Sequence, residues 1–316
     1  MNLKQIKAAQ KRTEQIIKKI HLEYSPFFSK LVNGDVYLKL ENLQLTGSFK
    51  IRGALNKILK LKPKEKKKGV LTVSAGNHGQ GIGYGAKLLG IKAIVIVPKN
   101  TPKIKIKAIE QYGIDLKILG KDYDEAEAEA RELERKTGMV YISPYNDADV
   151  IAGQGTIGLE ILKENPNIDT ILVPVGGGGL ISGIAIAVKS INPKIKVIGA
   201  QSAASPVMYE SLKAGKITGM KVKPSVAEGL HGGIEKESIT FDLVKNYVDS
   251  MLLVSEAEIK NAIRLFFKSH HQIAEGAGVV GLAALLRYKK QFKVHKIAVV
   301  ISGGNLDKKL LKKILH

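Results

Sequence analysis

Short apolar runs recur along the 316-residue chain, and stretches with helical periodicity lie between most of them. The apolar runs are residues 70–73, 93–97, 139–142, 170–175, 197–200 and 297–301. A strand that is buried on both faces has such a continuous apolar run, and strands that alternate with helices form a mostly parallel sheet covered on both sides. The sequence therefore predicts an α/β fold.

Further elements follow from the periodicity of the sequence. Alternation of apolar and polar residues predicts a half-exposed strand over residues 36–40. Helical patterns cover residues 3–19, 48–61, 122–136 and 180–190. The length allows two domains, although composition alone does not place their boundary. Parallel sheets bind ligands at the carboxyl ends of their strands, which directs attention to the turns after Val73, Val175 and Ile301.

Composition excludes several classes of protein. The chain has no cysteine, so disulfides, thiolate metal sites and a cysteine nucleophile are excluded. The first 15 residues are polar, unlike a signal peptide, and no segment has about 18 uninterrupted apolar residues. These features predict a cytoplasmic enzyme without a membrane partner.

The net charge of +21 allows two interpretations. One is a nucleic-acid partner, and the other is a lysine-rich surface without a specific partner. The basic residues are spread along the chain, and the densest run, residues 60–68, contains no aromatic residue on which bases could stack. We therefore expect no nucleic-acid partner and keep a basic nucleic-acid-binding protein as a remote alternative.

Four consecutive glycines, Gly176 to Gly179, lie between a predicted strand and a predicted helix that starts at Leu180. Without side chains, their backbone N–H groups can converge on a ligand, and the start of the helix adds partial positive charge. The alternative is a tight turn, for which one glycine would normally suffice. The turn is therefore predicted to bind phosphate. It is not a Walker loop, because no Lys-Ser or Lys-Thr pair follows it.

A second glycine pattern, Gly81-x-Gly83-x-x-Ala86, resembles a dinucleotide fingerprint only loosely. It falls inside a helical pattern, and the segment about 20 residues further on lacks the expected acid. We interpret it as close packing between helices.

Three more segments carry candidate site residues. Ser74 to Gln80 follows a predicted strand, and its small residues could turn amides toward a carboxylate, although Ser74 or Asn77 could also simply cap the next helix. Lys50 lies among apolar neighbours; such a lysine is usually a solvated charge, but a desolvated one can lose its proton and form a Schiff base. Ser302, followed by two glycines, could form a turn or place a hydroxyl in a crevice.

Together these segments resemble the fold-type-II pyridoxal-phosphate enzymes, in the branch that contains threonine and serine dehydratases and serine racemase. The resemblance runs from about Leu38 to Leu306. It rests on residues 40–42 leading to 48–50, and on residues 74–78, 151–156, 176–180 and 302–305. Each motif alone is weak, but all of them in this order are specific.

The resemblance implies a pyridoxal 5′-phosphate cofactor and a set of residues that hold it. These are Phe49, Lys50, Asn77, Gly176, Gly177, Gly178, Gly179, Leu180, Gly229 and Ser302. Lys50 would carry the cofactor covalently and move the α-proton, Phe49 would flank its ring, and Asn77 would bond its 3′-hydroxyl. Residues 176–180 would bind its phosphate, and Ser302 would face its pyridine nitrogen. The substrate carboxylate would lie against Ser74, Ala75, Gly76 and His78.

The implied activity is elimination of water from L-threonine or L-serine, giving a 2-oxo acid and ammonia. A serine hydroxyl gives a protonated pyridine no counter-charge, which favours prompt loss of the β-hydroxyl. The alternative is an amino-acid racemase, which needs an acid or base on each face of the α-carbon. The racemase-like members carry a second serine where this chain has Ala75, and this favours elimination. Threonine, serine and other 3-hydroxy amino acids are not distinguished.

The resemblance also bears on domains, metals and assembly. It implies a small mobile domain of residues 69–146 inserted into a large domain of residues 1–68 and 147–316. No metal is expected, because Gln201 occupies the place of a carboxylate ligand in the family. Glu275 matches a family position near the pocket. We expect no regulatory domain after Ser302, and a homodimer or homotetramer is expected.

Overall fold

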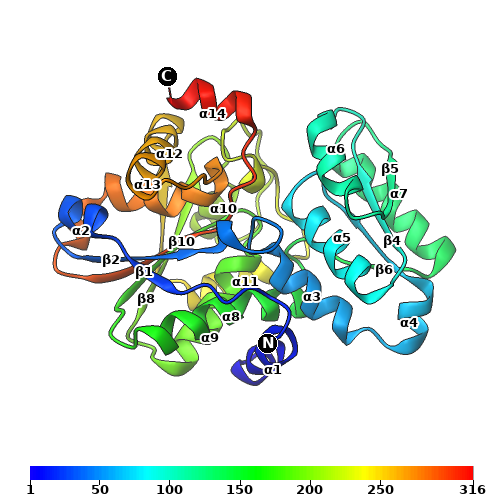
Figure 1. Cartoon of the computed structure of the whole chain (residues 1–316), viewed down its shortest axis with the longest axis horizontal. Helices are drawn as coiled ribbons and strands as arrows, with labels where there is room; N and C mark the ends of the chain where they lie inside the picture. The colour runs from blue at the N-terminus through cyan, green and yellow to red at the C-terminus, as the bar shows by residue number, and fades with distance from the viewer. Residues whose placement is uncertain (316) are drawn as a thin grey trace.

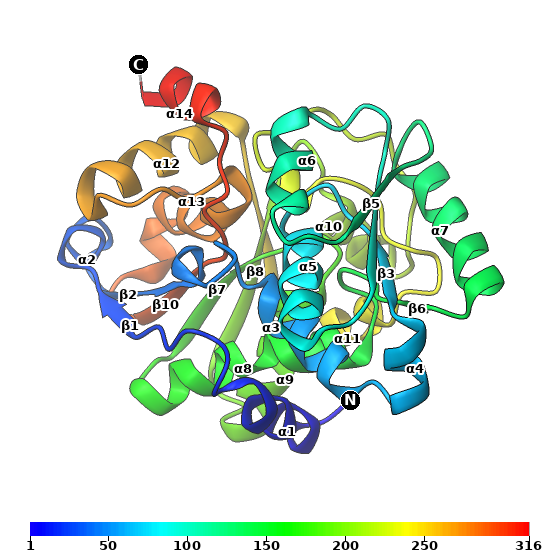
Figure 2. The ribbon, with the colours of Figure 1, turned by 45° about the vertical axis from the view of Figure 1, so that its right-hand side comes forward.

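The computed structural model describes residues 1–315, which form two lobes, each built on its own sheet (Figures 1 and 2). The larger sheet has the strand order β1-β2-β10-β7-β8-β9. Its strands are β1 (Leu22–Tyr24), β2 (Asp35–Leu40), β7 (Thr170–Pro174), β8 (Lys196–Ser202), β9 (Ser250–Val254) and β10 (Lys296–Ile301). All neighbours are parallel except β1 and β2.

Helices cover both faces of this larger sheet. The helices of this lobe are α1 (Leu3–Thr13), α2 (Pro26–Val32), α8 (Ala148–Glu164), α9 (Gly179–Ile191), α10 (Val207–Ala214), α11 (Ile239–Tyr247), α12 (Glu256–His270), α13 (Val280–Arg287) and α14 (Lys308–Leu315). Side chains alternate across the central strand β10. Ala298 and Val300 pack with residues of α8 and α9, whereas Val299 and Ile301 pack with residues of α12 and α13. This alternation explains why a buried parallel strand reads as a continuous apolar run.

The smaller sheet has the order β5-β4-β3-β6, with every pair parallel. Its strands are β3 (Val70–Val73), β4 (Ala93–Val97), β5 (Asp115–Ile118) and β6 (Val140–Tyr141), and its helices are α5 (Asn77–Leu89), α6 (Lys103–Glu110) and α7 (Tyr123–Thr137). Val95 of β4 packs with Ile109 of α6, whereas Ile96 packs with Ala126 and Ala130 of α7. The predicted α/β fold with mostly parallel sheets is confirmed.

Helix α3 (Lys50–Lys60) joins the two lobes and continues into α4 (Pro63–Lys68). It packs against α8 of the larger lobe and α5 of the smaller one. The approach to α5 is close, since a Cβ atom on Gly81 would lie 3.3 Å from the Cβ atom of Ala54, and one on Gly85 would lie 2.9 Å from Ile58. The small side chains in residues 81–86 therefore allow α5 to pack closely on α3, as the sequence predicted.

The first helix is shorter than predicted. The pattern over residues 3–19 predicted one helix, but α1 ends at Thr13. The side chain of Gln44 accepts a hydrogen bond from the backbone N–H of Lys18 and donates one to its carbonyl, at 2.9 Å each. These bonds hold the backbone in a non-helical path and let Ile17 pack beside Ile51. Periodicity cannot reveal a partner 26 residues away in the chain.

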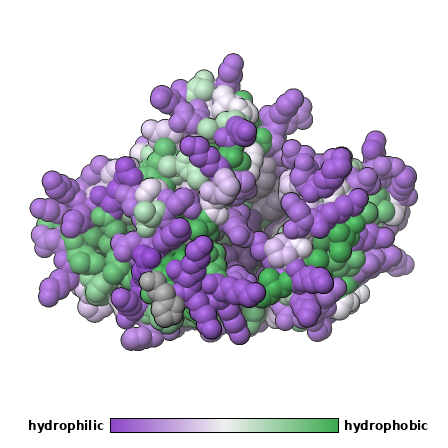
Figure 3. All heavy atoms as spheres, turned by 90° about the horizontal axis from the view of Figure 1, so that it is seen from above, coloured by the Kyte–Doolittle hydropathy of each residue, from purple (hydrophilic) through white to green (hydrophobic). Residues whose placement is uncertain are grey.

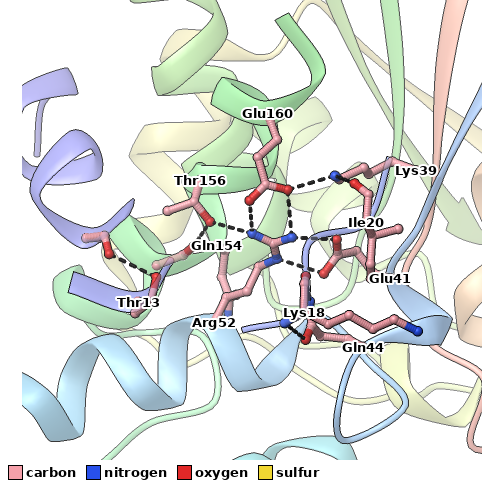
Figure 4. Close-up of polar contacts among 12 residues, drawn as sticks. Thr13, Lys18, Ile20, Lys39, Glu41, Gln44, Arg52, Gln154, Thr156 and Glu160 are labelled. Atoms are coloured by element: carbon pink, nitrogen blue, oxygen red, sulfur yellow. Dashed lines mark hydrogen bonds and ion pairs between the residues drawn. The ribbon is translucent and has the colours of Figure 1, made fainter. Parts of the chain in front are cut away.

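A buried network of four charged side chains fixes the start of α3 (Figure 4). Arg52 donates two hydrogen bonds to Glu41, at 2.7 and 2.8 Å, and two to Glu160, at 2.6 and 2.8 Å. Lys39 lies 2.7 Å from Glu160 and also donates to the carbonyl of Ile20. Arg52, Glu41 and Lys39 are fully buried, so two cations and two carboxylates neutralise each other away from water.

The network favours the charged forms of Arg52 and Glu160. Burial alone would lower the pKa of Arg52, but Glu41 and Glu160 together raise it. Burial would raise the pKa of Glu160, but Arg52 and Lys39 lower it. Glu41 comes from η1 (Glu41–Leu43), directly after β2, and Glu160 comes from α8. The first turn of α3, which has no side-chain cap, is thus held to the larger sheet by Arg52.

We expect the Arg52→Met substitution to lower the free energy of unfolding by about 3–5 kcal/mol, because it leaves Glu41 buried without a cation. Urea unfolding followed by circular dichroism measures the loss. Lys136→Met is the matched control: it breaks the exposed pair with Glu132, which contributes little to stability because solvent screens it. Equal, small losses in both variants would contradict a structural role for the network.

Candidate active site

Three of the predicted site segments follow the carboxyl ends of strands. One of these strands belongs to the smaller sheet and two belong to the larger sheet. Residues 74–78 follow β3, residues 176–179 follow β7, and residues 302–305 follow β10. The space-filling view from above shows a recess between the two lobes (Figure 3). The same view shows hydrophilic side chains distributed over this face rather than gathered in one patch.

Lys50 is the first residue of α3 and is half-buried. Its Nζ donates a hydrogen bond to the carbonyl of Pro144 at 2.8 Å and lies 5.2 Å from the centre of the Phe49 ring. A backbone pairing ties this segment to the turn after β10. The N–H of Phe49 donates to the carbonyl of Ser302 at 3.0 Å, and Ser48 forms a β-bridge with Gly303. Lys50 and Ser302 therefore belong to adjoining pieces of backbone.

Ser302 is buried, and its hydroxyl makes only a long contact, 3.5 Å, with the carbonyl of Ala277. The hydroxyl therefore retains its capacity to donate a stronger hydrogen bond to a ligand. The neighbouring hydroxyl of Ser48 is buried and lacks a hydrogen-bond partner among residues 1–315.

The glycine turn leads directly into α9. Gly178 has φ +88°, a conformation that side chains disfavour. A Cβ atom on Gly177 would lie 2.5 Å from the ring of Tyr145, and one on Gly179 would lie 2.9 Å from the Tyr145 backbone. Glycine is therefore required at Gly177 and Gly179 because Tyr145 lies against them, and at Gly178 because of its positive φ angle. Its N–H groups and the start of the 13-residue α9 form a site for an anion.

The segment after β6 connects Lys50 with the glycine turn. Pro144 accepts the hydrogen bond from Lys50, and the next residue, Tyr145, packs on Gly177 and Gly179. Tyr145 is fixed in turn, since its hydroxyl accepts a hydrogen bond from the N–H of Glu235 at 3.0 Å. The sequence analysis did not identify this segment. The signal was present, because residues 143–145 follow a predicted strand, as the other site loops do.

Asn77 begins α5 and reaches across to the larger lobe. Its Nδ2 donates to Glu275 at 2.6 Å, and its Oδ1 accepts from Asn305 at 2.7 Å. A Cβ atom on Gly303 would lie 3.2 Å from Asn77 Nδ2, so the amide lies against the turn that contains Ser302. The structure thus brings Asn77 and Ser302 together.

The expected substrate residues line the loop after β3. Ser74, Ala75 and Gly76 are partly exposed, and a Cβ atom on Gly76 would meet nothing within 4 Å. The Ser74 hydroxyl accepts from the N–H of Gly76 at 3.2 Å. His78 points inward: its Nε2 lies 3.1 Å from the carbonyl of Ile142, and its Nδ1 has no partner in the described part of the chain.

Gly229 lies in the turn η2 (Glu228–Leu230), next to the glycine turn. A Cβ atom on Gly229 would lie 3.2 Å from Ala277, and one on Gly176 would lie 3.0 Å from Leu230. The η2 turn therefore packs between Gly176 and the residues that precede α13. Leu180 is buried in the core under α9.

Burial changes the acidity of three groups here. Burial lowers the pKa of Lys50 to about 8, although Glu275 opposes the change. Burial, with a contribution from the charge of Lys50, lowers the pKa of His78 to about 3. Burial raises the pKa of Glu275 to about 7 against the hydrogen bond from Asn77. A lysine with a pKa near 8 is a nucleophile and base that is partly neutral at physiological pH.

Within residues 1–315, no group of three or more histidine and acidic side chains is arranged to hold a metal ion. Gln201, at the end of β8, is buried and accepts a hydrogen bond from the N–H of Tyr209. None of the helices in the described residues is long and apolar enough to cross a membrane.

The chain is similar in sequence to known enzymes over nearly its whole length. A family model described as "Pyridoxal-phosphate dependent enzyme" matches residues 13–303. An L-threonine ammonia-lyase of Thermotoga maritima is 45% identical over all of this chain and 78% of its own length. A catabolic L-threonine dehydratase of Escherichia coli is 42% identical over 95% of this chain and 91% of its own.

Solved structures resemble the whole chain. Serine racemase from Dictyostelium discoideum has a TM-score of 0.91 and 39% identity, over 97% of this chain and 99% of its own. The processed form of threonine deaminase isoform 2 from Solanum lycopersicum has a TM-score of 0.94 and 36% identity, over 99% of this chain and 91% of its own.

The chain therefore belongs to the family of pyridoxal-phosphate-dependent enzymes, as predicted, and it has their fold type II. The predicted cofactor is confirmed at the level of the family. The site fits that cofactor on structural grounds. It offers a half-buried amine for the aldehyde, a turn of glycine N–H groups for the phosphate, and the weakly bonded hydroxyl of Ser302 for a ring nitrogen.

We expect the rate at which the apoprotein reacts with pyridoxal phosphate to rise with pH, with a midpoint near pH 8, because only the neutral Lys50 amine attacks an aldehyde. Stopped-flow absorbance measures this rate. Glu275 raises the pKa of Lys50, so Glu275→Gln should move the midpoint to lower pH. A midpoint near 10.5, the ordinary value for lysine, would contradict the burial of this amine.

Proposed function

We propose that this protein eliminates water from L-threonine or L-serine and releases a 2-oxo acid and ammonia. The observation that carries the proposal is the position of the Lys50 amine, half-buried and joined to the glycine turn through Pro144 and Tyr145. The names of relatives at 42–45% identity, L-threonine ammonia-lyase and L-threonine dehydratase, support the same activity.

Bound pyridoxal phosphate would supply an electron-withdrawing ring that acidifies the α-hydrogen of an attached amino acid. Lys50 would take the proton from the α-carbon, for which its lowered pKa suits it. The N–H groups of residues 176–180 would hold the phosphate, Ser302 Oγ would bond the ring nitrogen, and Asn77 Nδ2 would bond the ring hydroxyl. Phe49 would flank the ring, and Gly229 would border it from η2.

The substrate carboxylate would bind in the loop after β3. Ser74, Ala75 and Gly76 border open space there, and the start of α5 adds partial positive charge. His78 forms the floor of this loop as a neutral imidazole, because its pKa is about 3. The β-hydroxyl would leave with a proton as water, and the released enamine would tautomerise to an imine. Addition of water to this imine would give the 2-oxo acid and ammonia.

Racemisation is the alternative activity, and the racemase structures among the neighbours keep it open. It requires a second acid or base opposite Lys50. Ala75, at the place of the second serine in the racemase-like members, carries no exchangeable proton. Elimination needs only Lys50 on the α-carbon, so the side chains of this loop favour elimination.

We expect the native protein with pyridoxal phosphate to release ammonia and a 2-oxo acid from L-threonine, L-serine or both, when tested on a panel of 3-hydroxy amino acids. Lys50→Ala should abolish turnover and the absorbance at roughly 410–420 nm, because the amine that carries the cofactor is gone. Lys64→Ala, which removes an exposed lysine of α4, should retain both properties. Formation of the D-enantiomer without ammonia would instead identify a racemase.

We further propose that residues 69–146 close over the substrate as a mobile domain against residues 1–68 and 147–316. Polar pairs that cross between the lobes support this, namely Asn77 with Glu275 and Lys105 with Glu228. Closure would exclude water during the reaction. Small-angle X-ray scattering should show a smaller radius of gyration when L-alanine, which has no β-leaving group, saturates the holoenzyme. An unchanged radius would argue against domain closure.

The exposed surface of the protein bears on its assembly. We propose a homodimer or homotetramer that acts in the cytoplasm on small amino acids and binds no nucleic acid. Exposed apolar side chains on β1 and α2, namely Tyr24, Phe27 and Leu31, support association of copies. Sedimentation at equilibrium tests the assembly, and an observed monomer would refute it.

A further inference from the structure

Four groups form a continuous row of hydrogen bonds beside the site. Asn305 Nδ2 donates to the carbonyl of Thr46 at 2.9 Å and to Asn77 Oδ1 at 2.7 Å. Asn77 Nδ2 then donates to Glu275 Oε1 at 2.6 Å. Asn305 belongs to one of the motifs singled out in the sequence, but the proposed reaction gives it no role.

The row has a defined direction. The carbonyl of Thr46 can only accept a hydrogen bond, so the end of the Asn305 amide that faces it must be the NH2 group. The same NH2 group reaches Asn77, so Asn77 must present its oxygen to Asn305. The NH2 group of Asn77 is thereby turned to the opposite side, toward Glu275 and the turn at Gly303. A backbone carbonyl thus determines which way the Asn77 amide faces.

Glu275 alone would not fix this orientation. Its pKa is raised to about 7, so near neutral pH the carboxyl group spends part of its time protonated. A protonated carboxyl group can donate as well as accept, and it would tolerate either orientation of Asn77. The direction therefore depends on the Asn305 end of the row.

The surrounding backbone leaves these side chains little room. A Cβ atom on Gly47 would lie 2.5 Å from Asn305 Oδ1, and Gly47 has φ +69°. A Cβ atom on Gly303 would lie 2.3 Å from Glu275 Oε1. Glycine at both positions lets the row pack directly against the backbone.

We propose that Asn305 is a positioning residue that holds Asn77 with its NH2 group, rather than its oxygen, toward the ring hydroxyl of the cofactor. The inference rests on the proposed function, in which Asn77 bonds that hydroxyl. An NH2 group has two hydrogens, so Asn77 can serve Glu275 and the cofactor together. A reversed amide would place an acceptor against the ring oxygen.

The test compares two substitutions of Asn305 by the dissociation constant of pyridoxal phosphate, titrated into the apoprotein without substrate. Both variants lose the bond to Thr46, so the difference between them reports on Asn77. Asn305→Ala removes the donor and should weaken binding about threefold. Asn305→Asp keeps the size but offers only acceptors, which draws the NH2 group of Asn77 away from the cofactor. It should weaken binding about tenfold or more and move the absorption band to shorter wavelength.

The order of the two effects separates positioning from packing. If Asn305 only filled space, its replacement by alanine would weaken cofactor binding more than its replacement by the isosteric aspartate. Asn305 is exposed, so both variants are expected to fold, and thermal unfolding of the apoproteins verifies this. Asn192→Asp adds the same charge at the end of α9, where the side chain only accepts from Lys194, and should leave binding unchanged.

Binding as tight as that of the native protein in Asn305→Ala and Asn305→Asp would overturn the inference, as would weaker binding in the alanine variant than in the aspartate variant. Failure of the native protein to bind pyridoxal phosphate, or to act on any 3-hydroxy amino acid, would instead refute the proposed function. The two failures are therefore distinguishable.

Discussion

The buried pairing of Arg52 with Glu41 and Glu160 is the constraint on which the site depends. A buried ion pair adds little stability over an apolar core, but it tolerates little displacement, because any unpaired charge left away from water is costly. Here the charges come from the end of β2, the first turn of α3 and the middle of α8. The hydrogen bonds of Arg52 tie the first turn of α3 to η1 and α8, and they thereby help to place Lys50, two positions before Arg52.

Helix α3 transmits this constraint to both lobes. On the α8 side, a Cβ atom on Gly53 would lie 2.7 Å from the carbonyl of Val150, and one on Gly153 would lie 2.5 Å from the carbonyl of Arg52. On the other side, α5 packs on α3 through Gly81, and α5 begins with Asn77. The lysine and the asparagine of the site are therefore placed by two close contacts of the same helix. If the smaller lobe moves, α3 must either move with it or lose its contact with α5.

The sequence predicted the parts of this molecule that depend on local chemistry. Residues 70–73 and 93–97 were placed correctly as strands, because buried parallel strands need continuous apolar residues. The four glycines at Gly176–Gly179 were placed correctly between a strand and a helix, and their binding of phosphate stays a prediction. The network around Arg52 could not be found in this way. Its partners Glu41 and Glu160 lie 11 and 108 residues away in the chain, and a single charged residue shows no periodicity. The order of the strands decides which charged side chains are buried together. Local sequence patterns do not encode that order.

Pro144 and Tyr145 follow a predicted strand but stand in no recognisable motif, so they were not predicted. Their contribution is a carbonyl oxygen and a ring that fits against glycines, and neither depends on a recognisable residue pattern. Asn77 and Ser302 were identifiable because they stand in motifs. The roles proposed for them nevertheless depend on neighbours such as Glu275 and Ala277, which reach them only in the folded chain.

Burial acts in opposite directions on the pKa values of Lys50 and Glu275. It lowers the pKa of Lys50 to about 8 and raises that of Glu275 to about 7, so burial disfavours the charged form of each group. Each group stabilises the charge of the other, since Glu275 raises the pKa of Lys50 and Lys50 lowers the pKa of Glu275. Once Lys50 becomes neutral, Glu275 loses part of this support and its pKa rises further. At a given pH the carboxyl group beside Asn77 is then more often protonated, and the direction of the Asn77 amide depends on Asn305 and the carbonyl of Thr46.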